Sequence, residues 1–160
     1  MKKIIPFDDI GALSDALKIL GKSIVTTNGT FDLLHVGHVD SLEHSKSLGD
    51  VLIVGVNSDE SVKRYKGPLR PIVPVEERAK MLASLSCVDY VVIFEQDTPV
   101  DLLMKIKPTV HCKGAEYSDG SRLIPEKNVV ESYGGKMHYI DLTLDKSTTN
   151  IIEKIFARHE

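Results

Sequence analysis

Short apolar runs that alternate with segments of helical length constrain the fold of this chain more than any other feature. Five such runs lie at about residues 23–27, 51–56, 90–94, 109–112 and 137–140. The run Val51–Val56 is almost continuously apolar, as is typical of a strand buried on both faces of a parallel sheet. The alternation therefore predicts an α/β fold with a doubly wound, parallel, five-stranded sheet and helices on both faces.

Most segments between the runs carry helix signals. Apolar residues recur at helical spacing from Ile10 to Leu20, and Gly21 ends that helix. Thr98 as a cap, with Pro99 at the first helical position, predicts another helix start. Further helices are predicted from about Gly37, from Glu76 to Ser86 and from Pro125. We expect one domain, 1–160, in which residues 1–22 form a lead-in helix and 23–160 the core.

Two further segments are predicted to be a basic loop and the last helix. Ser61–Pro74 is predicted to be a loop because it is rich in proline and glycine, and it is the most basic segment of the chain. Ser147–Thr149 are predicted to cap the last helix. The apolar residues of that helix are expected to face inward: Ile151, Ile152, Ile155 and Phe156.

Composition excludes several classes of function. The net charge of −3 gives no basic surface for nucleic acid, so any anion site must be local. Cys87 and Cys112 have no metal-ligand spacing and are expected to be reduced and packed in the core. No signal peptide or 18-residue apolar run is evident, so we expect a cytoplasmic protein with no membrane segment.

Polar clusters follow three of the predicted strands: Gly29–His38, Asn57–Asp59 and Lys113–Gly114. In Rossmann-like sheets, ligands bind beyond the carboxyl ends of the strands, so these clusters point to one crevice. Gly29–His38 reads G-T-F-D-L-L-H-V-G-H and ends where a helix begins. Free N–H groups at a helix N-terminus attract phosphate, and His35 and His38 would lie near one face beside Gly37. The alternative is one capping histidine and one exposed histidine.

The string Gly29–His38 resembles the signature of the HxGH nucleotidyltransferase superfamily, which includes cytidylyltransferases and pantetheine-phosphate adenylyltransferase. Further motifs resemble one branch, the adenylyltransferase domain of the bacterial ADP-heptose synthase, over roughly residues 10–156. These motifs are Val54–Lys63, Lys66–Pro68, Arg70–Pro71, Glu76–Arg78, Cys87–Tyr90, Lys113–Gly114 and Ser147–Ile152. In relatives a glycine precedes the S-T-T motif, whereas Asp145 and Lys146 stand here.

The resemblance implies transfer of a nucleotidyl group from an NTP to a sugar 1-phosphate, without a covalent enzyme intermediate. Catalytic residues would be His35 and His38, which donate hydrogen bonds to the α-phosphate, and Lys63 and Lys66, which reach the phosphates. The implied nucleotide-binding residues are Gly29, Thr30, Phe31, His35, Gly37, His38, Lys113, Gly114, Ser147, Thr148 and Thr149. Mg²⁺ would arrive with the nucleotide, since no dedicated metal cluster is evident.

The acceptor side is less determined by the motifs. Asp32 either positions the signature through backbone contacts or contacts the substrate, and Arg78 is either a surface charge or a phosphate ligand. Asn57, Asp59 and Arg122 are further candidates for the substrate side. Residues 115–128 differ from the heptose branch and are expected to line the acceptor pocket.

ATP and D-glycero-β-D-manno-heptose 1-phosphate are the substrates that the resemblance favours. A CTP-dependent glycerol-phosphate cytidylyltransferase is the alternative in the same reaction class. A nucleotide-binding sensor without turnover is the alternative of another class. The resemblance also implies a homodimer.

Overall fold

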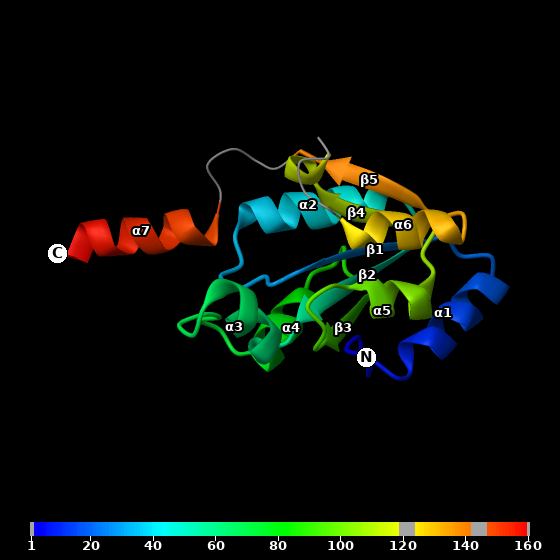
Figure 1. The fold of residues 1–160 in the computed structure, drawn as a ribbon, viewed down its shortest axis with the longest axis horizontal. Coiled ribbons are helices and arrows are strands. Elements are labelled where there is room, and N and C mark those ends of the chain that lie inside the picture. The colour runs from blue at the N-terminus through cyan, green and yellow to red at the C-terminus, as the bar shows by residue number, and fades with distance from the viewer. Residues whose placement is uncertain (1, 119–123, 142–146, 160) are drawn as a thin grey trace.

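The computed structural model describes residues 2–118, 124–141 and 147–159 (Figure 1). The strands are β1 (Ile24–Gly29), β2 (Val51–Asn57), β3 (Tyr90–Phe94), β4 (Val110–Gly114) and β5 (Lys136–Ile140). The helices are α1 (Ile10–Ile19), α2 (Val36–Ser47), α3 (Asp59–Lys66), α4 (Val75–Ala83), α5 (Val100–Ile106), the 3₁₀ turn η1 (Ala115–Tyr117), α6 (Pro125–Ser132) and α7 (Thr148–His159).

The strands form one sheet in the order β3-β2-β1-β4-β5, and all neighbours are parallel. Val25 of β1 lies between Leu52 of β2 and Val110 of β4. The chain moves outward from β1 through β2 to β3, and then crosses back to β4 and β5. The point where the strand order reverses therefore lies between β1 and β4, which is where such sheets bind ligands. The predicted five-stranded, doubly wound α/β fold is confirmed.

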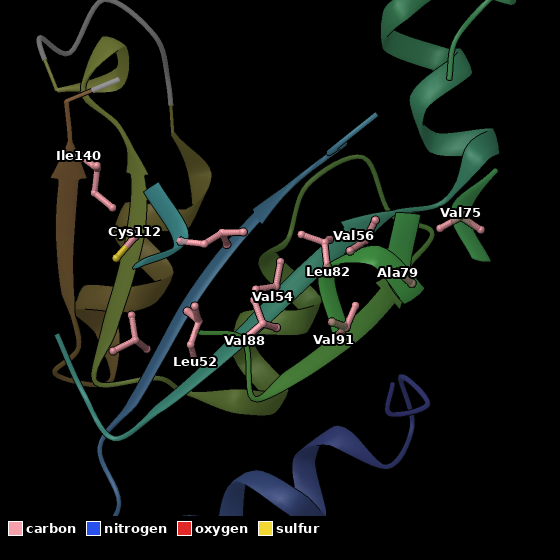
Figure 2. Packing of buried hydrophobic residues seen from close by; sticks show 12 residues of the cluster. Leu52, Val54, Val56, Val75, Ala79, Leu82, Val88, Val91, Cys112 and Ile140 are labelled. Atoms are coloured by element: carbon pink, nitrogen blue, oxygen red, sulfur yellow. The ribbon is translucent and has the colours of Figure 1, made fainter. Parts of the chain in front are cut away.

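Helices cover both faces of the sheet because alternate residues of β2 point in opposite directions. Leu52, Val54 and Val56 join a buried cluster with residues of α2 and α4, and Figure 2 shows Val54 and Val56 near Leu82 of α4. On the other face, Val51 and Ile53 pack with residues of α1 and α5. The all-buried pattern of β2 is therefore the result of two cores that share one strand.

The predicted loop Ser61–Pro74 is wrong in its first half, because Asp59–Lys66 is the helix α3. Ser58 caps this helix, since its side chain accepts a hydrogen bond from the backbone N–H of Ser61 at 3.2 Å. Asp59 and Glu60 in the first turn complement the helix dipole. The irregular part of the segment is limited to residues 67–74.

Two other local predictions are corrected. Helix α5 begins at Val100, with Pro99 in the capping position and no hydrogen bond from a capping side chain, so Thr98 is not the cap. Leu20 is 72 % exposed and does not belong to the buried face of α1. No helix in the described part of the chain is long and apolar enough to cross a membrane.

The last helix is capped as predicted but does not turn its apolar face inward. The hydroxyl of Ser147 accepts a hydrogen bond from the N–H of Asn150 at 3.0 Å. Ile155 and Phe156, however, are 52 % and 66 % exposed. Figure 1 shows the reason, because α7 extends away from the sheet instead of packing on it.

Candidate functional site

A cavity of about 730 Å³ lies at the carboxyl ends of β1, β2 and β4. Its wall also includes the first turn of α2, the end of α3 and the residues that open α6 and α7. Many of the residues singled out in the sequence line it: Gly29, Thr30, Phe31, Asp32, His35, Gly37, His38, Asn57, Lys66, Lys113, Gly114, Ser147, Thr148 and Thr149. Three others, Lys63, Asp59 and Arg78, are not part of its wall, and Arg122 lies outside the described residues.

The two signature histidines lie together at the start of α2. His35 occupies the capping position in an extended conformation, and its carbonyl accepts the N–H of His38 at 3.0 Å. Their rings are stacked, with centroids 3.8 Å apart. The ring of Phe31 lies 5.2 Å from that of His38, and a Cβ at Gly29 would come within 3.2 Å of the Phe31 ring. Glycine at position 29 therefore leaves room for the aromatic ring that supports His38.

His38 is an uncharged hydrogen-bonding group at neutral pH. Burial, the neighbouring His35 and Lys66 lower the pKa of His38 from 6.5 to about 4. Its Nδ1 is buried without a hydrogen-bond partner among the described residues. A neutral imidazole still carries one N–H donor, so His38 faces the cavity as a donor without positive charge.

The end of α3 places a positively charged side chain, that of Lys66, on the cavity wall. Lys66 lines the cavity, and its pKa is lowered by burial and by the nearby Arg70. Lys63 points elsewhere, since its ammonium bonds the carboxylate of Glu60 at 2.7 Å. Tyr65, which sequence reasoning missed, joins α3 to the signature through a 2.6 Å contact between its hydroxyl and that of Thr30.

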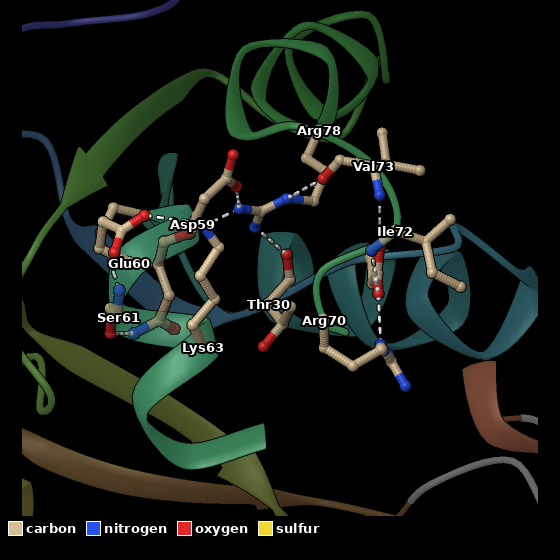
Figure 3. A network of polar contacts seen from close by, with 12 residues as sticks. Thr30, Asp59, Glu60, Ser61, Lys63, Arg70, Ile72, Val73 and Arg78 are labelled. Atoms are coloured by element: carbon tan, nitrogen blue, oxygen red, sulfur yellow. Dashed lines mark hydrogen bonds and ion pairs between the residues drawn. The ribbon is translucent and has the colours of Figure 1, made fainter. Parts of the chain in front are cut away.

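Arg78 is buried, so the alternative of a surface charge is wrong, and it is not part of the cavity wall, as the alternative of a phosphate ligand would require in this structure. It is 1 % exposed and donates to the carbonyl oxygens of Thr30, Asn57 and Val73. Its Nη2 also bonds Asp59 Oδ1 at 2.7 Å, so Asp59 is held by Arg78 instead of facing the cavity. Figure 3 shows Arg78 at the centre of contacts that join the signature to the start of α3 and to the loop before α4.

Asp32 holds the same loop from the side of the signature. Its carboxylate accepts hydrogen bonds from the backbone N–H groups of Ile72 and Val73, both at 2.9 Å, and from Nε of Arg70 at 2.7 Å. Burial alone would raise the pKa of Asp32, but these hydrogen bonds outweigh burial and lower it. The geometry matches the positioning role that was one of the two alternatives for this residue.

The part of the cavity wall formed by the end of β4 and the start of α6 contains a buried ion pair. Lys113 Nζ lies 2.8 Å from Oε1 of Glu126, and the two side chains are 13 % and 5 % exposed. Glu126 belongs to the first turn of α6 and was missed, because a glutamate after a proline is also an ordinary helix start. Lys113 therefore faces the cavity together with a carboxylate, as a pair of opposite charges.

The start of α7 completes the cavity. The hydroxyl of Thr148 donates to the carbonyl of Leu33 at 3.3 Å, which ties the S-T-T segment to the signature. Three segments far apart in the sequence thus meet at one place: the signature, the end of α3 and the first residues of α7.

The chain is similar to known proteins over most of its length. The sequence pattern of the Cytidylyltransferase-like family matches residues 26–154. "Bifunctional protein HldE" of Geobacter metallireducens is 51 % identical over 157 residues, which are 98 % of this chain and 32 % of that protein. The protein of the same name from Syntrophotalea carbinolica is 49 % identical over 152 residues, 93 % of this chain and 31 % of that protein. The chain thus spans about a third of the length of these relatives.

Solved structures share the fold of this chain. A lipopolysaccharide core biosynthesis protein from Thermoplasma volcanium GSS1 is similar at 27 % identity and a TM-score of 0.62, over 77 % of this chain and 98 % of that chain. A pantoate-β-alanine ligase from Francisella tularensis shares the fold at 16 % identity and a TM-score of 0.63, over 100 % of this chain and 80 % of that chain. The match over residues 26–154, with the signature on the wall of the cavity, means that the chain belongs to the cytidylyltransferase-like family.

Proposed function

We propose that the protein is a nucleotidyltransferase that joins the nucleoside monophosphate of ATP to D-glycero-β-D-manno-heptose 1-phosphate. The observation that carries this proposal is the stacked pair His35 and His38, which lines a cavity shared with Lys66 and the start of α7. About 50 % identity to proteins named HldE, over nearly the whole chain, supports the choice of reaction. These comparisons do not favour the CTP-dependent alternative.

In the proposed reaction, a phosphate oxygen of the sugar 1-phosphate forms a bond to the α-phosphorus of the nucleotide. The bond from that phosphorus to the oxygen shared with the β-phosphate breaks, and pyrophosphate leaves with this oxygen. Such transfers give a protein little covalent work, so catalysis rests on position and charge. His38 and His35 donate hydrogen bonds to the α-phosphate oxygens as negative charge accumulates there, while Lys66 supplies positive charge.

The other walls of the cavity would hold the rest of the nucleotide. The hydroxyls and free N–H groups of Ser147, Thr148 and Thr149 suit the β- and γ-phosphates at the start of α7. Lys113 and Gly114, at the end of β4, would lie beside the nucleoside. Asn57, at the end of β2, is the remaining candidate for the acceptor side that lines the cavity.

Mg²⁺ is proposed to enter with the triphosphate. Two carboxylates of the cavity wall, those of Asp32 and Glu126, are already engaged by protein donors, so the proposal assigns neither of them to the ion. The described residues contain no group of three side chains that could hold a metal ion by themselves. A hard ion that keeps water and phosphate ligands needs no such group, and when bound it would neutralise phosphate charge.

Release of pyrophosphate is the measurement that tests this function. Each of the four NTPs is combined with a panel of phosphorylated acceptors that includes the heptose 1-phosphate and glycerol 3-phosphate. We expect turnover with ATP and the heptose 1-phosphate. Preference for CTP and glycerol 3-phosphate would replace the proposed substrates. ATP binding without turnover on any acceptor, unchanged in His38→Ala, would instead indicate a sensor.

We also propose that the protein acts in the cytoplasm as a homodimer. Two exposed apolar residues of α7, Ile155 and Phe156, support association of two copies of the chain. Helix α7 extends away from the sheet, so no part of the described chain covers these two side chains.

A further inference from the structure

The loop of residues 67–74, between α3 and α4, places an arginine on the cavity wall. The proposed reaction assigns no role to this arginine. Arg70 lines the cavity, and its side chain is 19 % exposed. The loop is held in place at three points by Asp32, whose own side chain is 1 % exposed. A buried carboxylate that accepts two backbone N–H groups and one guanidinium N–H has little freedom to move.

The contact with Asp32 uses only one nitrogen of the guanidinium. Nε of Arg70 donates to Asp32 Oδ2 at 2.7 Å, whereas the two terminal nitrogens make no hydrogen bond to any part of the chain that the structure describes. Figure 3 shows Arg70 beside Ile72 and Val73, on the side of the network that is remote from the start of α3. The two terminal nitrogens of the planar guanidinium therefore remain as donors, and together they can bind two oxygens of one phosphate.

The charge of the cavity also requires a further cation. Two phosphate groups must approach each other in the reaction, and His38 is a donor without positive charge. Among the cations that line the described wall, Arg64 is engaged by Asp97 at 2.7 Å and Lys113 by Glu126 at 2.8 Å. Arg70 is also paired with a carboxylate, that of Asp32, but through Nε alone, so beside Lys66 it still offers the N–H groups of its two terminal nitrogens. A guanidinium stays charged at any pH at which the protein is folded.

The position of the loop indicates which phosphate Arg70 would meet. Arg78 ties the loop at Val73 to Asn57 at the end of β2, on the side of the signature opposite to β4. The proposed nucleotide wall consists of the end of β4 and the start of α7. A second substrate therefore has room to approach from the side of β2, where Arg70 lies.

We propose that Arg70 is a further phosphate-binding residue that takes the phosphate of the acceptor, and that Asp32 is the positioning residue that aims it. This inference rests on the proposed nucleotidyl transfer. It assigns a role to the Arg70–Pro71 motif, and it gives the buried Asp32 carboxylate a second role beside that of holding the loop.

Steady-state kinetics with each substrate varied in turn test the role of Arg70. We expect Arg70→Ala to raise the KM for the sugar 1-phosphate about 10- to 100-fold, as for loss of a hydrogen bond to a charged group, while the KM for ATP changes little. Arg70→Lys keeps the charge but not the two terminal nitrogens, so it should recover only part of the loss. Lys80→Ala, an exposed residue of α4 outside the cavity, is the control and should match the wild type.

Chemical rescue separates binding by Arg70 from a structural effect. Guanidinium chloride at non-denaturing concentration should restore several-fold activity to Arg70→Ala and none to Asp32→Asn, in which Arg70 is present but not aimed. Wild-type kinetics in Arg70→Ala would overturn the proposal. Selective loss of ATP affinity would overturn the assignment to the acceptor phosphate.

A direct measurement of phosphate binding tests the role of Arg70 even if the protein shows no turnover. If the wild type releases no pyrophosphate with any substrate pair, the proposed function fails, and titration with inorganic phosphate then addresses Arg70 alone. Weaker phosphate binding by Arg70→Ala than by the wild type and Lys80→Ala would support the role of Arg70. Equal binding by all three proteins would refute it.

Discussion

The imidazole rings of His35 and His38 are stacked, with centroids 3.8 Å apart and planes inclined by 24°. Two imidazolium ions at this separation would repel each other, and burial adds to the cost of charging His38. His38 therefore offers an N–H donor on a neutral ring. This arrangement suits a transition state in which negative charge develops beside groups that are already in place.

His38→Ala is expected to lower kcat about 100- to 1000-fold, because it removes one preorganised donor to the α-phosphate. The affinity for ATP, measured by titration calorimetry, should change far less than kcat. His44→Ala is the matched control on the same helix, since His44 is exposed and does not line the cavity. A similar loss of activity in both variants would indicate damage to α2 instead of loss of a donor.

The pH dependence of stability should also report His38. Its pKa is 6.5 in a peptide and about 4 in the folded chain, so between these values only the unfolded state binds the proton. The free energy of unfolding is thus expected to fall as pH decreases from about 6.5 to 4. His38→Asn removes the titrating group, and urea unfolding across this range should show a smaller decrease. An identical decrease in variant and wild type would mean that His38 titrates normally.

The two lysines of α3 should behave differently. Lys66 lines the cavity, and Lys66→Ala is expected to reduce kcat/KM about 100-fold, because a charge near the phosphates is lost. Lys63 bonds Glu60 outside the cavity, so Lys63→Ala should remain within a few-fold of the wild type. Both values come from the same pyrophosphate-release assay. Equal losses would show that Lys63 moves to the substrate during the reaction.

The sheet could be predicted from the sequence because burial on both faces leaves strands such as β2 without polar residues up to the last position, Asn57. The helix α3 was missed for the opposite reason. Within Asp59–Lys66 only Ser61 and Val62 are buried, so no apolar periodicity marks the helix. Its remaining signals were Ser58 as a cap, acidic residues in the first turn and Gly67 after the last turn. The nearby prolines outweighed those signals.

The cavity wall was predictable where one segment supplies several of its residues, as at Gly29–His38. Arg78 was not, since a charged residue on a helix is usually exposed. Its spacing held a signal, because Val75, Ala79 and Leu82 place Arg78 on the buried face of α4. The contacts of Asp32 with Arg70 and of Lys113 with Glu126 bridge distant segments, and no local pattern encodes them.

Arg78→Met is expected to destabilise the protein by about 3–5 kcal/mol, because it leaves the Asp59 carboxylate and three carbonyl groups without their donor. Arg64→Met is the matched control. It removes an exposed pair with Asp97, which contributes about 0–1 kcal/mol in typical cases. Urea unfolding at neutral pH measures both variants. A cost for Arg78→Met as small as that of the control would contradict the central role of this arginine.

The proposed homodimer should depend on the exposed end of α7. The double variant Ile155→Ser, Phe156→Ser removes two apolar side chains from a face that the described chain leaves uncovered. We expect light scattering after size exclusion to show a dimer for the wild type and a monomer for the variant. The start of the same helix holds Thr148 against Leu33, so the monomer should also bind ATP more weakly. Leu20→Ser, at an exposed site beyond α1, is the control for loss of surface apolar area. A dimer that persists in the double variant would place the interface elsewhere.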